Sequence, residues 1–98
     1  MKLNQQQRKH LRGLAHALQP VVMIGQKGNS PAVAQELDGA LTAHELVKVS
    51  IRLGDRELRD QTIAELEQQT QSTLVTRIGN IAALYRALKD KPKIVLPD

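Results

Sequence analysis

Two glycines in this sequence have the spacing of a phosphate-contacting loop. Gly25 and Gly28 enclose Gln26 and Lys27, directly after an apolar run and just before a proline that suits the start of a helix. Such glycines let the backbone approach a phosphate, while backbone N–H groups, the positive helix end and Lys27 attract the anion. An ordinary turn that needs a positive φ explains the same spacing, so both interpretations stay open here.

The chemistry of an enzyme is not supported by the other candidate residues. In GTPases and ATPases the loop lysine follows a glycine and precedes Ser or Thr. Here Lys27 precedes Gly28, and Asn29 follows that glycine. His10 and His16 point in different directions on one helix, His44 has no nearby ligand pair, and cysteine is absent. We therefore expect no catalytic residue, metal, cofactor or small-molecule substrate.

Charge is distributed unevenly along the chain. Residues 1–35 carry a net charge of +5 without a single acid, residues 36–76 carry −4, and residues 77–98 carry +3. A basic region of this kind is expected where a protein meets a polyanion such as RNA, although a solubilising surface explains it equally well. The bases of the first segment are Lys2, Arg8, Lys9, Arg12 and Lys27.

Aromatic residues are almost absent, since Tyr85 is the only one. RNA-binding sheets that stack bases on several aromatic rings are therefore excluded. If this chain binds RNA, it has to contact the backbone and the shape of the RNA.

The first expected element is a helix over residues 4–18 with one apolar and one cationic face. Its apolar stripe consists of Leu11, Leu14, Ala15 and Leu18, and its cationic face of Arg8, Lys9, Arg12 and His16. Next come a strand at 21–24 buried on both faces and a helix at 31–43 capped by Ser30. A strand at 45–53 follows, with Lys48, Ser50 and Arg52 on its polar side. A third helix is capped by Asp55, buries Leu58, Thr62, Ile63 and Leu66 and ends near residue 70, and two strands at 73–78 and 81–86 are joined by Gly79-Asn80.

This order predicts a single α/β domain, an α-β-α-β-α-β-β sandwich with a four-stranded mixed sheet. The glycines at 25 and 28 then lie at the carboxyl edge of the sheet, where open α/β sheets bind ligands. The domain is expected to occupy residues 1–98, with a core at about 3–86 and a tail at 87–98 that packs loosely except for Ile94-Val95-Leu96. The chain has neither the apolar core of a signal peptide nor the roughly 18 apolar residues of a membrane span, so we expect neither secretion nor membrane insertion. The absence of cysteine fits a reducing compartment, so we expect a cytoplasmic location, and we also expect a monomer.

Several motifs resemble, in order and spacing, the CRM domain family, named for chloroplast RNA splicing and ribosome maturation, and in particular its stand-alone bacterial, YhbY-type members. The likeness extends over about residues 3–86, and Ala87 departs from it where proline is expected. It rests on Gly13-Leu14-Ala15-His16, Pro20-Val21-Val22, Ile24-Gly25-Gln26-Lys27-Gly28, His44-Glu45-Leu46-Val47-Lys48-Val49, Asp55-Arg56-Glu57, Ile78-Gly79 and Leu84-Tyr85-Arg86.

The resemblance implies a fold similar to the C-terminal domain of translation initiation factor three, and a non-catalytic role in assembly of the large ribosomal subunit, bound to its precursor through ribosomal RNA. The alternative is a protein-interaction module on the ribosome whose basic surface is incidental. The candidate RNA-binding residues are Gly25, Gln26, Lys27, Gly28, Arg8, Lys9 and Arg12, with Lys48, Arg52 and Arg86 as further candidates.

Overall fold

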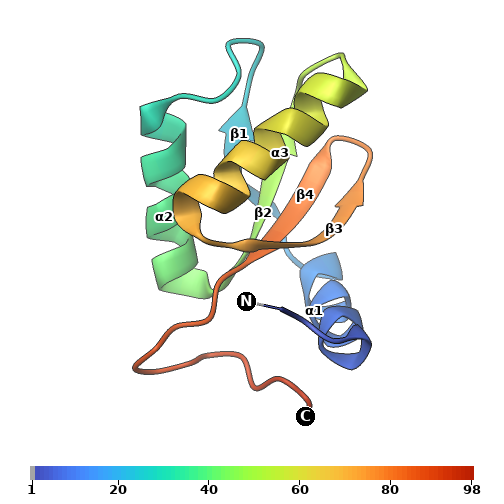
Figure 1. The fold of residues 1–98 in the computed structure, drawn as a ribbon, viewed down its shortest axis with the longest axis vertical. Helices are drawn as coiled ribbons and strands as arrows, with labels where there is room; N and C mark the ends of the chain where they lie inside the picture. The colour runs from blue at the N-terminus through green and yellow to red at the C-terminus, as the bar shows by residue number, and fades with distance from the viewer. Residues whose placement is uncertain (1) are drawn as a thin grey trace.

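The computed structural model describes residues 2–98 as three helices and one sheet (Figure 1). The fold class is therefore α/β, as predicted, and the predicted order of elements is confirmed. The elements are α1 (Gln5–His16), β1 (Pro20–Ile24), α2 (Pro31–His44), β2 (Leu46–Ile51), α3 (Arg56–Thr70), β3 (Thr73–Ile78) and β4 (Ile81–Tyr85).

The sheet has four strands in the order β1-β2-β4-β3 and is mixed. β1 and β2 run parallel, whereas β4 pairs antiparallel with both β2 and β3. β1 and β3 are thus the two edge strands, and the segment between β1 and β2 contains the crossover helix α2.

The larger core lies between the sheet and the helices α2 and α3. Leu37 and Leu41 of α2 and Ile63 and Leu66 of α3 pack there against buried side chains of the strands. The strand residues of this core are Val22 and Ile24 of β1, Val47, Val49 and Ile51 of β2, and Ala82 and Leu84 of β4.

The smaller core lies on the opposite face of the sheet, because side chains alternate along each strand. There Leu11 and Ala15 of α1 pack against residues at one end of the sheet, including Leu46 and Tyr85. Leu46 pairs with Tyr85, whereas the other end of β2 pairs with Ile24 of β1, so α1 covers only the end of this face that is remote from the glycine loop.

Local signals in the sequence explain where the helices begin. Asn4 forms a capping box with Gln7, in which each side chain accepts the other's backbone N–H. Ser30 accepts the N–H of Val33 at 3.2 Å, and Asp55 caps α3, as predicted. The helix α1 ends at His16, so Leu18 lies outside it.

Several apolar residues that were predicted to be buried are exposed. β1 is an edge strand, and its residues Val21 and Met23 are 52% and 56% exposed because they point to a part of the sheet that α1 does not cover, so the prediction of burial on both faces was wrong. Leu14 in α1 and Leu18 just after it are 40% and 37% exposed and line an open apolar pocket, and Leu58 in the first turn of α3 is 49% exposed.

The C-terminal tail is more firmly attached than the prediction of loose packing allowed. The buried carboxylate of Glu45 accepts the backbone N–H groups of Leu88 at 2.9 Å and of Ile94 at 2.7 Å, and also that of Lys93. Ile94 and Leu96 pack against the smaller core, as predicted, whereas Val95 between them points to solvent. Among the described residues, no helix has the length and apolar character needed to span a membrane.

Candidate nucleic-acid interface

The glycine loop, residues Gly25 to Gly28, follows β1 directly and precedes the capped start of α2. The N–H of Gly28 donates to the carbonyl of Gly25 at 3.0 Å, which closes the loop into a tight turn. In Figure 1 this loop projects at the top of the molecule, above the label of β1. Gln26 and Lys27 between the glycines are exposed.

The backbone conformation requires glycine at one of the two glycine positions of the loop and not at the other. Gly28 has a φ of +74°, a backbone conformation that L side chains rarely adopt, so the turn itself requires it. Gly25 has no such φ, and a Cβ added there meets no atom within 4 Å. The fold therefore explains Gly28 but does not explain Gly25.

The end of the loop is tied to α3. The side-chain Nδ2 of Asn29 donates to Gln69 Oε1 at 3.1 Å and lies 3.5 Å from Glu65 Oε1. On the other side, the N–H of Arg52 donates to the carbonyl of Ile24 at 2.8 Å. Arg52 therefore lies next to the first residue of the loop, and its side chain is exposed.

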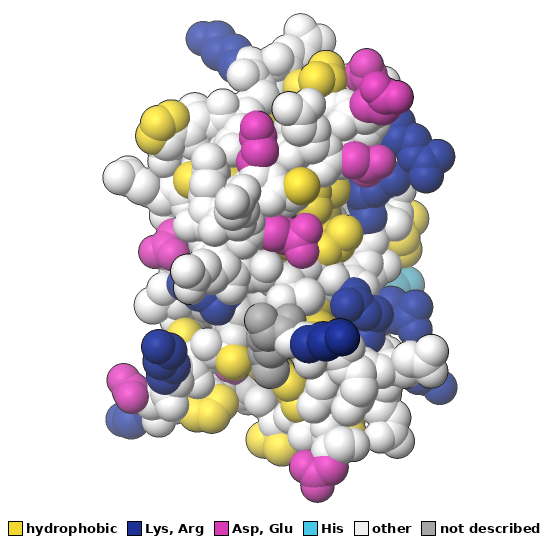
Figure 2. All heavy atoms as spheres, in the orientation of Figure 1, with side chains coloured by type: hydrophobic (Ala, Val, Ile, Leu, Met, Phe, Trp, Pro, Cys, Tyr) yellow, Lys and Arg dark blue, Asp and Glu magenta, His cyan; other side chains and the backbone are white. Residues whose placement is uncertain are grey.

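Acidic residues are segregated from one face of the sheet. Neither α1 nor any of the four strands contains Asp or Glu, whereas α2 contains two and α3 contains four of the ten acids. Figure 2, which views the side of α2 and α3, shows Asp and Glu side chains over α3 and a group of Lys and Arg side chains along the right-hand edge. We call the opposite face, on the side of α1, the acid-free face, because α1 and the strands contain no Asp or Glu. The tail also reaches α1, where the carbonyl of Pro97, next to the terminal Asp98, accepts a hydrogen bond from Gln7.

The cations of α1 divide into two kinds. Lys9 and Arg12 are exposed on the helix, and their side chains make no hydrogen bond or ion pair within the described part of the chain. Arg8 is half-buried, and its Nη1 donates to the carbonyls of Leu74 at 2.6 Å and Val75 at 3.2 Å in β3. Arg8 therefore helps to attach α1 to the sheet, while Lys9 and Arg12 are free to bind an anion.

Lys48 and His16 border a groove on the acid-free face. The groove has a volume of about 250 Å³ and lies between the end of α1 and the strands β3 and β4, with Thr76, Ile78, Ile81 and Ala83 as its other walls. The Nζ of Lys48 donates to the carbonyl of Leu18 at 3.1 Å. β2 ends at Ile51, so Arg52, which was predicted to lie within the strand beside Lys48, follows directly after it.

Arg86 lies away from the other candidates. It follows Tyr85 at the end of the sheet opposite to the glycine loop. Its guanidinium donates to Asp38 Oδ1 at 2.6 Å, to the carbonyl of Thr70 at 2.9 Å and to Thr42 Oγ1 at 2.9 Å. These contacts give Arg86 a structural role in joining β4 to α2 and α3.

Three arginines that the sequence did not single out gather beside the hairpin between β3 and β4. Arg56, Arg59 and Arg77 line a hollow of about 330 Å³ together with Gly79. Arg77 forms an ion pair with Asp60 at 3.1 Å, whereas Arg56 is exposed. The net charges of the three segments did not reveal this group, because Arg56 and Arg59 belong to residues 36–76, whose net charge is negative.

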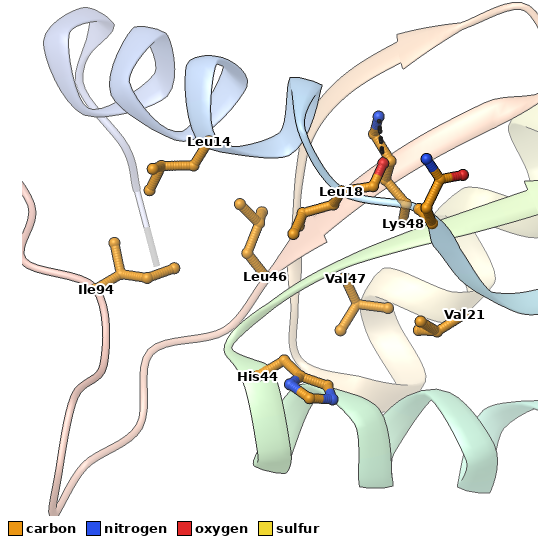
Figure 3. Close-up of a pocket in the computed structure, with 9 residues that line it drawn as sticks. Leu14, Leu18, Val21, His44, Leu46, Val47, Lys48 and Ile94 are labelled. Carbon is orange, nitrogen blue, oxygen red and sulfur yellow. Dashed lines mark hydrogen bonds between the residues drawn. The ribbon is translucent and has the colours of Figure 1, made fainter.

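A separate apolar pocket of about 420 Å³ lies between α1, β2 and the tail (Figure 3). Figure 3 shows Leu14 of α1 and Ile94 of the tail on one side of the pocket, with Leu46 of β2 next to them. Its polar lining residues are Gln19, His44 and Lys48. The described residues include no group of three or more His, Asp or Glu side chains that could hold a metal ion.

Comparison with known proteins places these features in a family. The family model described as the CRS1 / YhbY (CRM) domain matches residues 3–86. A protein from Haemophilus influenzae named RNA-binding protein is 41% identical over 95 residues, which cover 97% of this chain and 95% of that protein. A Bacillus subtilis protein named a probable RNA-binding protein is 34% identical over 97% of this chain and 99% of its own length.

A solved structure has the same fold. The solution structure of a hypothetical protein from Staphylococcus aureus, described as a candidate RNA-binding protein, superposes with a TM-score of 0.85 at 31% identity. The match covers 98% of this chain and 100% of that one. The predicted resemblance is thereby confirmed, and this chain belongs to the CRS1 / YhbY (CRM) domain family.

Proposed function

We propose that this protein binds RNA without catalysing a reaction, and that it acts on ribosomal RNA in the assembly of the large ribosomal subunit. The observation that carries the proposal is the acid-free face, which is bordered at one end by the glycine loop and at the other by the cations of α1. The relatives named as RNA-binding proteins and the family resemblance support the same function.

Binding is expected to depend on phosphate contacts. Gly25 and Gly28 let the backbone approach a phosphate, and Gln26 and Lys27 lie between them at the tip. Lys9, Arg12 and Arg52 offer exposed cations, with Lys48 in the groove and Arg8 as a half-buried neighbour. Arg86 contributes least, because its guanidinium is already bound by α2 and α3.

Salt dependence tests the electrostatic part of this proposal. If about five phosphates are contacted, the slope of log affinity against log salt is near −4, a loss of roughly two decades between about 50 and 200 mM salt. Filter binding with ribosomal RNA measures this slope. A flat response refutes the proposal.

Charge-removal variants localise the binding surface. Replacing both Lys9→Gln and Arg12→Gln should weaken binding and reduce the slope by about 2, because two phosphate contacts are lost. The matched control replaces Lys89→Gln and Lys91→Gln, which remove the same charge from exposed positions in the tail. Equal losses in the two pairs would mean that only net charge matters.

The alternative function, a protein-interaction module on the ribosome, is favoured by one observation. The apolar pocket of Figure 3 is open to solvent between Leu14, Leu18 and Ile94, and such surfaces commonly bind proteins. Nuclease treatment of large-subunit precursor particles separates the two functions. A protein held by RNA dissociates after the treatment, whereas one held by a protein partner stays bound.

A further inference from the structure

Four residues form a row across the acid-free face, one from each strand. Met23 pairs with Ser50, Ser50 pairs with Ile81, and Ile81 pairs with Ile78. Because neighbouring strands lie about 4.8 Å apart, the row extends about 14 Å across the sheet. We call these four residues the cross-strand row.

The cross-strand row is open to solvent at both ends. Met23 is 56% exposed and Ile78 is 74% exposed, whereas Ser50 between the strands is buried. The helix α1 packs at the other end of this face, against Leu46 and Tyr85, and leaves the row uncovered. Between the row and α1 lies the groove that His16 and Lys48 border.

Cationic groups flank the row on both edges of the sheet. On the side of β1, the glycine loop begins two residues after Met23, and Arg52 lies beside it. On the side of β3, Gly79 follows Ile78 directly and lines the hollow of Arg56, Arg59 and Arg77. Of these arginines, Arg77 is paired with Asp60 and Arg59 donates to the carbonyl of Leu53, whereas Arg56 is exposed. The exposed apolar side chains therefore lie between the glycine loop with Arg52 on one edge and Arg56 on the other.

We infer that the cross-strand row binds unpaired RNA, a conclusion that rests on the proposed function and specifies its ligand. The faces of the bases lie against Met23, Ile81 and Ile78, while the backbone is held by the glycine loop at one edge and the exposed arginine at the other. A duplex keeps its base faces stacked inside and presents mainly phosphate and ribose, so it would leave these apolar side chains uncovered. Unpaired bases offer flat faces that such side chains can cover.

The lack of exposed aromatic rings means that this mode of binding cannot use ring stacking and adds aliphatic contacts with bases to the backbone contacts expected from the sequence. Tyr85, the only aromatic residue, is 2% exposed and lies at the far end of the sheet. Aliphatic side chains must therefore provide the contact that rings provide in other single-strand-binding sheets. Clamping of the backbone by a Gly-x-x-Gly loop is a known way to fix such a strand.

The experiment compares one ribosomal RNA oligonucleotide in single-stranded form with the same oligonucleotide annealed to its complement. Titrations at one fixed salt concentration are carried out with the wild type and with the variants Met23→Gln and Ile78→Thr. The control is Leu58→Gln, since Leu58 is similarly exposed, at 49%, but lies on α3 on the other side of the sheet. Thermal unfolding verifies that all variants are folded.

We expect the single strand to bind about tenfold or more tightly than the duplex, because stacking-type contacts are available only to unpaired bases. Each row variant should weaken single-strand binding about four- to fifteenfold, the equivalent of one or two buried methylene groups. Leu58→Gln should bind like the wild type. Equal binding of duplex and single strand, or row variants that match the control, would overturn the inference while leaving RNA binding intact.

Two further outcomes are distinguishable. Failure of both RNA forms to bind would overturn the proposed function together with the inference. Row variants that bind RNA normally but lose a protein from purified precursor particles would assign the row to a protein partner, and would overturn the inference alone.

Discussion

Gly25→Ala separates the two interpretations of the glycine loop more sharply than any change at Gly28. Continuing the alternation of β1, a side chain at position 25 projects onto the acid-free face, since Ile24 points into the larger core. The added Cβ meets no atom of the protein within 4 Å. The substitution therefore perturbs a bound phosphate and leaves the folded chain unperturbed.

The expected magnitudes follow from the backbone conformations. Gly25→Ala should change stability by about +0.4 to +1 kcal/mol, because alanine restricts the unfolded chain, and should raise the Tm by a few degrees. Gly28→Ala forces a left-handed conformation at a φ of +74° and should lower stability by about 1–2 kcal/mol. If one hydrogen bond to a phosphate is lost at Gly25, about 1.5 kcal/mol, binding weakens roughly tenfold.

Parallel measurements of the Tm and of RNA affinity check this prediction. The clamp interpretation requires that Gly25→Ala binds about tenfold more weakly at an equal or higher Tm. If Gly25→Ala binds RNA as tightly as the wild type, the loop is an ordinary turn and the reasoning from backbone approach is refuted. Gly28→Ala serves as the comparison in which stability and binding fall together.

Two predictions concern the folded state. Glu45→Gln removes the charge that accepts three tail N–H groups and should destabilise the protein by about 2–3 kcal/mol in urea unfolding, whereas a loss below about 0.5 kcal/mol contradicts the tail attachment. Burial, and secondarily the charge of Glu45, raises the pKa of the Tyr85 phenol above its ordinary 10.0. The folded state then holds this proton more tightly than the unfolded chain, so the stabilisation is full below pH 10.0 and is lost as the pH rises through the folded pKa. Ultraviolet absorbance of tyrosinate follows Tyr85 alone, and an onset at or below the ordinary pKa would disprove the shift.

The sequence by itself determined the kinds and order of the elements. Caps such as Ser30 and Asp55 mark helix starts through side-chain contacts with their own neighbours, and the Gly79-Asn80 pair fits a hairpin in which Gly79 has a φ of +61°. The glycine loop and the basic N-terminal third were also visible in it. These features depend on residues a few positions apart, which a sequence displays directly.

Only the tertiary structure decided which neighbour covers each face. The run from Val21 to Ile24 has the composition of a strand buried on both sides, but the order β1-β2-β4-β3 places it at an edge and exposes Met23. Arg86 became a structural residue through contacts with Asp38, 48 positions away, and the cross-strand row joins four strands in a single register. The periodicity of a segment shows which of its side chains share a face. Whether that face is buried, and which charges lie near it, depends on pairing with distant segments, and the four strands meet only in the folded sheet.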